Sequence, residues 1–155
     1  ALPALGFVPD IAHGKVSLNE VAVTAEMILP GDGYLDYVKA FRSYEDVHVL
    51  AAITAYRLGE AIDGMWPEQS IEAHISLILA LRALSDMNLQ KAPAHIALAA
   101  IRTQLEDLLS RSDEYFQKSN PQAYSGWQRD KRLLSVARQA HQTRTESAWQ
   151  KMLLP

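Results

Sequence analysis

Residues 29–64 read LPGDGYLDYVKAFRSYEDVHVLAAITAYRLGEAIDG, and they divide the chain into two parts of different character. The first six of these residues form a predicted turn, because Pro30 fixes its backbone φ angle and the glycines on either side of Asp32 accept positive φ. From about Ser43 to Ile62, apolar residues recur at the spacing of one helix face. Since strand-like alternation precedes the turn and helical periodicity follows it, we expect a domain boundary here.

Two carboxylates lie near the start of this predicted helix. Ser43 is expected to be the N-cap, which puts Glu45 and Asp46 in the first turn, where carboxylates suit the exposed N–H groups and the positive end of the helix dipole. A second interpretation stays open, because a carboxylate that faces a dry cleft has a raised pKa and can serve as a general base. Glu45 and Asp46 are therefore the candidate catalytic residues.

The composition indicates a single folded domain with a small addition. A chain of 155 residues with 48% hydrophobic content can bury a substantial core. The net charge of −3 and the pI of about 5.9 argue against nucleic acid as a partner, because the chain has no overall basic field. The absence of cysteine excludes disulfides and thiolate metal sites and favours a cytoplasmic location.

Neither a membrane span nor an N-terminal signal pattern is predicted. No apolar run approaches the length needed to span a bilayer, and the first residues lack the basic and then apolar pattern of a signal peptide. We therefore expect a soluble protein without a membrane span. The first residue is Ala, which agrees with a processed or truncated chain.

The residues before the turn predict a short β segment. Lys15 to Val23 alternates between apolar and polar side chains, with a break near Asn19-Glu20, and this is typical of one or two strands. An isolated hairpin is marginal in water, so these strands need a sheet from a partner chain or from another part of the protein. We assign residues 1–34 to this β stub and turn, and residues 35–155 to a helical domain.

Three further helices are predicted after the first. They cover residues 67–87, 93–117 and 127–152, and residues 118–126 are expected to be a loop because of Asn120-Pro121 and Gly126. Four long helices with short links predict a mainly α fold, an antiparallel four-helix bundle. The second helix is apolar nearly all round between residues 71 and 84, so we expect the chain to form a homo-oligomer.

Neither metal binding nor a phosphate loop is predicted. Four histidines lie singly on predicted helices, and no pair has the i, i+4 spacing of a zinc site: His48, His74, His95 and His141. Gly31-Asp32-Gly33 lacks the GxGxxG spacing and the following Lys of a phosphate cradle. This short segment is interpreted as a turn.

The last predicted helix is basic within an acidic chain. Between Trp127 and Lys151 there are six Lys or Arg residues and two acidic residues. Arg129, Arg138 and Arg144 are candidates to hold an anionic ligand such as a nucleotide pyrophosphate, and a solvated basic face is an equal alternative. The polar run 138–147 interrupts the apolar face, so we expect a polar group or water opposite it, at a crevice or a subunit boundary.

Several phrases resemble acyl-CoA dehydrogenases over nearly the whole chain. Residues 21–31 resemble the phrase that ends the central β-domain of this family, and residues 37–49 and Leu58-Gly59-x-Ala61 are similar to a divergent, short branch of its C-terminal helical bundle. Arg129-Asp130 resembles the Arg-Asp pair that opens the final catalytic segment. The resemblance implies the C-terminal part of a flavoprotein that oxidises an acyl-CoA at Cα–Cβ with FAD, and that passes electrons to a partner protein.

The chain also departs from the family pattern at its catalytic position. The glutamate that removes the substrate proton in that family corresponds to Arg138 here, followed by Gln139-Ala140. The Arg-x-x-Phe-Gly phrase that contacts flavin pyrophosphate is replaced by residues 63–67, and no Gly-Gly loop precedes Arg129. A branch of the family carries its base on the first bundle helix, which would assign this role to Glu45 or Asp46.

These departures leave two expectations for the function. One is the C-terminal part of an acyl-CoA dehydrogenase-like oxidoreductase, with FAD bound by the complete protein and with this chain inactive alone. The other is a non-catalytic helical module that serves packing or dimerisation after loss of the active site.

Overall fold

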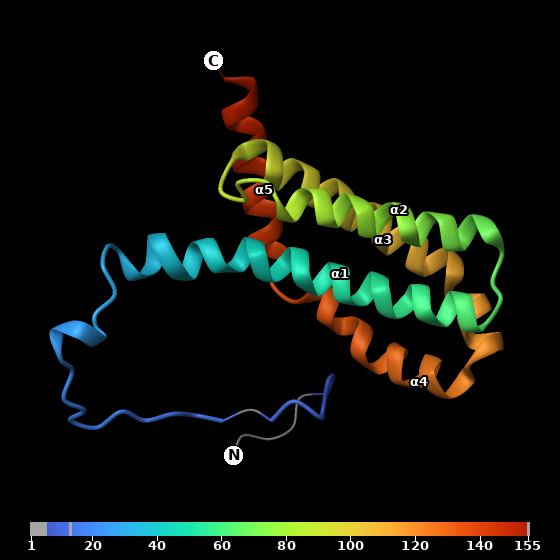
Figure 1. Cartoon of the computed structure of the whole chain (residues 1–155), viewed down its shortest axis with the longest axis horizontal. Helices are drawn as coiled ribbons and strands as arrows, with labels where there is room; N and C mark the ends of the chain where they lie inside the picture. The colour runs from blue at the N-terminus through green and yellow to red at the C-terminus, as the bar shows by residue number, and fades with distance from the viewer. Residues whose placement is uncertain (1–5, 13, 155) are drawn as a thin grey trace.

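The computed structural model describes residues 6–12 and 14–154. Five α-helices account for most of this part of the chain (Figure 1): α1 (Lys39–Asp63), α2 (Glu68–Ser85), α3 (Ala92–Ser119), α4 (Pro121–Asp130) and α5 (Arg138–Leu153). No strand is present among the described residues. The expected mainly α fold class is therefore confirmed.

The first helical segment begins earlier than the sequence indicates. A π-helical turn, Gly33–Val38, leads directly into α1, and the Asp32 carboxylate caps it by accepting hydrogen bonds from the N–H groups of Tyr34 and Leu35. Gly31 precedes it with a φ of +88°, where a Cβ would collide with a nearby carboxylate. The expected N-cap at Ser43 is therefore wrong, since Asp32 already satisfies the free N–H groups.

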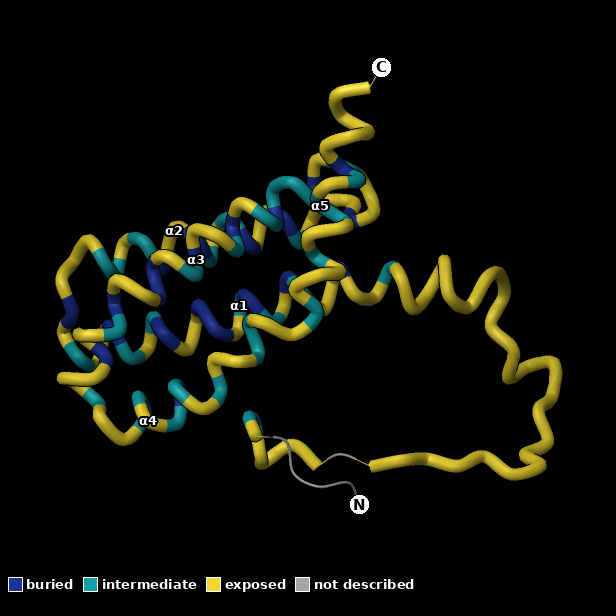
Figure 2. The backbone as a smooth tube through the Cα atoms, turned by 180° about the vertical axis from the view of Figure 1, so that it is seen from behind, coloured by how far each residue is buried: buried dark blue, intermediate teal, exposed yellow. Residues whose placement is uncertain are grey.

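Helices α1, α2 and α3 lie side by side and enclose the core (Figure 1). Figure 2 shows that their buried residues face the space where the three helices meet. Leu50, Ala61, Leu81 and Leu105 are among the most deeply buried apolar side chains. Short links join α1 to α2 and α2 to α3, so that neighbouring helices run antiparallel.

The single last helix expected over residues 127–152 is wrong, as is the loop before it. Asn120 ends α3 and caps α4 through its side chain, which accepts a hydrogen bond from the Ala123 N–H, so Pro121 begins a helix and not a loop. After α4, the 3-10 turn Lys131–Ser135 packs Leu133 and Leu134 against the core. Ala137 then adopts a left-handed conformation, with φ of 58°, and α5 starts in a new direction.

The N-terminal arm, residues 14–32, is extended and exposed. The short 3-10 turn Ala25–Met27 is its only helical part within the described residues, and Val16 and Leu18 are 81% and 77% exposed. The expected strands are not formed here, because this segment has no neighbouring strand edge with which to pair. Residues 6–12, which precede this arm, lie near α4 (Figure 1), where the Val8 N–H donates a 2.7 Å hydrogen bond to Asp130 Oδ1.

A fully buried arginine joins α1 to α3 inside the core. The guanidinium carbon of Arg57 lies 4.3 Å from the ring centre of Phe116 and 5.1 Å from that of Trp66. Arg57 donates a 2.8 Å hydrogen bond to the Ser112 hydroxyl and pairs with the Asp113 carboxylate at 3.3 Å. Burial lowers the pKa of Arg57, and the charge of Asp113 opposes this effect. The pair therefore compensates a charge that would otherwise be costly in the core.

Asp113→Asn is expected to lower the free energy of unfolding by about 3 kcal/mol, because Arg57 would keep its buried charge without a counter-charge. The control is Asp107→Asn, which removes the exposed pair with Arg111 and should change stability by less than about 0.5 kcal/mol. Urea unfolding of both variants measures the difference. Equal losses in the two variants would show that the Arg57–Asp113 pair has no special role.

Candidate functional site

The candidate site is centred on the carboxylate of Asp46, whose side chain is only 15% exposed. Arg144 donates a 2.8 Å hydrogen bond from Nη2 to Asp46 Oδ2. Arg102 Nη2 lies 3.8 Å from Asp46 Oδ1, and His141 Nδ1 lies 3.1 Å from Oδ2. One carboxylate from α1 thus meets basic side chains from α3 and α5.

Helix spacing explains why these groups meet. Asp46 lies three residues after the buried Ser43, on the face of α1 that packs into the domain. His141 and Arg144 are three residues apart and share one face at the start of α5. Arg144 also donates a 3.3 Å hydrogen bond to the Ser43 hydroxyl, and Arg102 donates one of 3.2 Å to the Leu134 carbonyl. The cluster therefore ties α5 and the turn before it to α1 and α3.

The charges around Asp46 keep it ionised. Burial alone would raise the pKa of Asp46, but the hydrogen bond and the charge of His141 and the charge of Arg144 outweigh burial, so the pKa lies below its ordinary value. A general base that works near neutral pH needs a raised pKa instead. Asp46 therefore has the properties of an ion-pair anchor. The expected capping role of Asp46 is wrong, because α1 begins at Lys39 and Asp46 lies beyond its first turn.

His141 links the two arginines. Arg144 Nη2 lies 2.7 Å from its Nδ1, and Arg102 Nη2 lies 3.2 Å from its Nε2. An unprotonated Nδ1 accepts the hydrogen bond from Arg144, whereas a protonated Nδ1 donates to Asp46. The position of one proton on His141 therefore decides which partner it holds.

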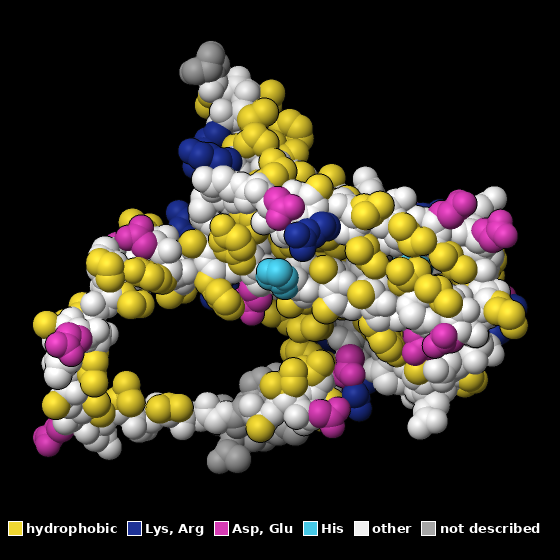
Figure 3. Space-filling model, in the orientation of Figure 1, with side chains coloured by type: hydrophobic (Ala, Val, Ile, Leu, Met, Phe, Trp, Pro, Cys, Tyr) yellow, Lys and Arg dark blue, Asp and Glu magenta, His cyan; other side chains and the backbone are white. Residues whose placement is uncertain are grey.

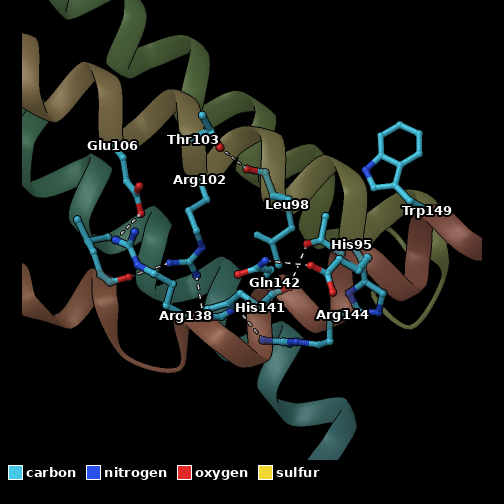
Figure 4. A pocket seen from close by; sticks show the side chains of 14 residues that line it. His95, Leu98, Arg102, Thr103, Glu106, Arg138, His141, Gln142, Arg144 and Trp149 are labelled. Atoms are coloured by element: carbon cyan, nitrogen blue, oxygen red, sulfur yellow. Dashed lines mark hydrogen bonds and ion pairs between the residues drawn. The ribbon is translucent and has the colours of Figure 1, made fainter.

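Two cavities lie on either side of this cluster. The first has a volume of about 270 Å³ and opens between α3 and α5, where Figure 4 shows Arg102, Arg138, His141 and Gln142 around it. The second has a volume of about 100 Å³ and lies between α1 and the segment that leads into α5. Glu45 and Asp46 both line the second cavity. The polar run on α5 thus faces a crevice and polar partners, as its sequence predicted.

The structure does not bring together the three arginines that were candidates to bind an anionic ligand. Arg129 lies on α4 and pairs with Asp130 at 2.6 Å, and this pair with the Val8 N–H lowers the pKa of Asp130 to about 2. Arg138 is 69% exposed and lies 3.8 Å from the Glu106 carboxylate. Only Arg144 belongs to the Asp46 cluster. Each of these arginines has an acidic neighbour of its own.

Two members of the cluster were not identified from the sequence as site residues. Arg102 interrupts the apolar face of α3 between the buried Leu98 and Leu105, and this position is a signal that a buried charge needs a partner. His141 was interpreted only as an isolated histidine. Asp46 is too distant in sequence from both residues for local spacing to show the contact.

Comparisons with protein-family models, with characterised proteins and with solved structures found no match to this chain. Within residues 6–12 and 14–154, no group of three or more acidic or histidine side chains is placed to hold a metal ion. The same part of the chain has no helix with the length and apolarity needed to cross a bilayer.

Asp46→Asn is expected to reduce the free energy of unfolding at pH 7 by about 3 kcal/mol, because Arg102 and Arg144 would lose their shared counter-charge. The neighbouring change Glu45→Gln is the control and should cost less than about 0.5 kcal/mol, since Glu45 is exposed and has no ion pair with another described residue. Urea unfolding at several pH values measures both effects.

The pH dependence gives a second check on Asp46. Its pKa is lower in the folded state, so its stabilisation is present above the unfolded value near 3.9 and is lost as the pH falls through the folded pKa. Wild type and Asp46→Asn should therefore converge in stability below that point. A difference that does not decrease at all as the pH falls below 3.9 would contradict the ion-pair role.

Proposed function

We propose that this chain is the C-terminal helical part of an acyl-CoA dehydrogenase-like flavoprotein. One observation supports this proposal above the others. Glu45 and Asp46 on α1 and the residues that follow Arg129-Asp130 line the same cavity, although they are far apart in sequence. A branch of the resembled family carries its base at the first of these places, and the second leads directly from Ala137 into Arg138, the usual base position, so their proximity agrees with the resemblance.

Glu45 is the better candidate for a base in this proposal. Asp46 is held by Arg144 and His141, and its pKa is lowered, whereas the exposed Glu45 lies on the wall of the same cavity without an ion pair to another described residue. A free carboxylate can accept a proton from a neighbouring carbon acid when it is within reach. Arg138 occupies the usual base position of the family and cannot take that role, because a guanidinium stays protonated.

The described residues alone do not fit FAD. Arg129 and Arg138 are engaged by Asp130 and Glu106, so they do not form a pyrophosphate site. The cavity beside Glu45 has a volume of about 100 Å³, below the range of roughly 300–1,000 Å³ typical of small-molecule sites. In this proposal FAD and the acyl-CoA would depend on a second wall from the β-domain of the complete protein.

The same proposal assigns specific roles to the exposed arm and to the helices. The alternating residues 15–23 would add a strand to the sheet of that β-domain, because an extended segment with free backbone groups can pair with a sheet edge. Helices α1, α2 and α3, with α4 and α5 in place of the single last helix, would correspond to the four-helix bundle of the resembled domain. An electron-transfer protein would be the redox partner.

A non-catalytic packing or dimerisation module is the second candidate. The observation that favours it is the exposure of Ile75 and Leu79 on α2, and apolar side chains gather on this side of the molecule in Figure 3. An apolar face of this kind is a place where a second copy of the chain could pack. Arg138 at the base position agrees with such a loss of catalysis.

The chain alone is expected neither to bind FAD at micromolar concentration nor to oxidise an acyl-CoA. A site formed by the helical domain alone leaves much of the ligand exposed to water, and it lacks the enclosure on which the affinity of small-molecule sites depends. Flavin fluorescence during FAD titration measures binding, and reduction of an artificial acceptor after addition of an acyl-CoA measures the reaction. Micromolar binding with steady reduction would contradict this expectation.

Purification of the natural gene product distinguishes the two candidate functions. A flavoprotein is expected to show flavin absorption bands, and its intact mass should exceed that of these 155 residues. A colourless product that contains only the described helical domain would favour the packing module.

A further inference from the structure

A basic pocket lies at the end of the domain where α1 begins. Its volume is about 670 Å³, and its lining comes from residues 39–43 of α1, residues 90–95 before and within α3, and residues 143–151 of α5. Four cationic side chains from these elements line it: Lys39, Lys91, Arg144 and Lys151. No aspartate or glutamate is among the described residues of its lining. On a chain of net charge −3, this is a marked local concentration of positive charge.

Hydrogen bonds and packing between elements hold the walls of this basic pocket. Arg144 on α5 donates to the Ser43 hydroxyl on α1 at 3.3 Å. Gln90 donates from its side chain to the Ala40 carbonyl at 3.3 Å, which holds the link between α2 and α3 against α1. Ala148 is buried at the pocket and fixes α5 against its neighbours. The three elements that supply the cations are therefore attached to one another.

Most of the positive charge in the basic pocket is uncompensated. Asp46 neutralises Arg144, but Lys39, Lys91 and Lys151 have no ion pair with any other described residue. Three exposed lysines from three separate elements thus line one cavity. The Ser147 hydroxyl lies in the same lining and can donate a further hydrogen bond.

His95 gives an independent sign of the positive potential. It lines the basic pocket, and its pKa is lowered first by burial and then by the charges of Arg144, Lys151 and Lys39, with Asp46 opposing them. Lys39 and Lys151 therefore act together with Arg144 on this side chain. An anion in this pocket would reverse part of that effect.

We propose that the basic pocket binds a small anion with a terminal diphosphate group. Three lysines match the three or more negative charges of such a group, and each ammonium can donate charge-assisted hydrogen bonds to phosphate oxygens. The enclosure between α1, α3 and α5 fits a compact anion. The basic pocket shares Arg144 with the cavity of the proposed catalytic function, but its three lysines do not line that cavity, and binding here does not require flavin.

Two sources would supply the same chemistry, free inorganic pyrophosphate and a nucleoside diphosphate. Isothermal titration calorimetry of the whole chain with pyrophosphate, ADP, AMP and FAD distinguishes them. Pyrophosphate and ADP are expected to bind, AMP more weakly. FAD should bind at least about tenfold more weakly than ADP, because its diphosphate is esterified at both ends and carries fewer charges. Binding of ADP and AMP without pyrophosphate would overturn the proposal, since the nucleoside would then be the recognised part.

Lysine variants test the site itself. Lys91→Gln and Lys151→Gln should each weaken pyrophosphate binding by about tenfold, because each removes one charge-assisted contact. Lys118→Gln is the matched control, since it removes the same charge from an exposed position near the other end of α3 and should change the Kd by less than about twofold. Equal weakening in all three variants would show that the effect depends only on the net charge of the protein, and this would overturn the proposal. An absence of pyrophosphate binding at millimolar concentration would also overturn it.

His95 gives a readout that depends on position. The charged groups that face it are Arg144, Lys151, Lys39 and Asp46, so a bound anion should raise the pKa of His95 in an NMR titration of the histidine rings. His48, an exposed histidine on α1 outside the lining of the basic pocket, should show no change in its ring signals when pyrophosphate is added. A shift in both histidines, or in neither, would contradict binding in the basic pocket.

Discussion

The arrangement of α5 depends on one buried carboxylate. Asp46 is the counter-charge for Arg144, lies close to Arg102 and contacts His141, so it joins α1 to two other helices. Without that contact, two largely buried guanidinium groups would share no anion, which is costly in a protein interior. The direction that α5 takes after Ala137 places His141 and Arg144 against α1. The cavities beside the cluster and the basic pocket beyond it follow from this placement.

A second buried charge holds the other end of α1. Arg57 lies among aromatic rings and pairs with Asp113 on α3, about three helical turns from Asp46 along α1. The two ion pairs have opposite polarity with respect to α1, since α1 supplies the anion (Asp46) in one pair and the cation (Arg57) in the other. Buried ion pairs contribute little net stability compared with apolar contacts, but each removes arrangements that would leave its charge unpaired. We interpret both as devices that fix how α3 and α5 lie against α1.

The sequence predicted the local helices better than their ends and connections. Helical periodicity identified α1, α2 and α3, because each buries a stripe of apolar residues against the others. The start of α1 was misplaced because Asp32 and Ser43 are both good N-cap residues, and local pattern does not decide between them. The break after α4 was missed because Leu133 and Leu134 fit a helical face as well as a tight turn. The sequence does indicate that Arg57 is buried, because Arg57 lies on the same face of α1 as the buried Leu50, Thr54 and Ala61.

The candidate site was harder to predict than the fold, because its contacts join distant parts of the chain. Spacing identified Asp46 but favoured a capping role, and it did not pair Asp46 with Arg102 or Arg144.

The most direct test of the ion-pair account is the pKa of Asp46, measured by carbon-detected NMR of its carboxyl group across a pH titration of the folded chain. The account predicts a pKa below the ordinary aspartate value near 3.9. A pKa above that value would contradict it and would return Asp46 to the candidates for a general base.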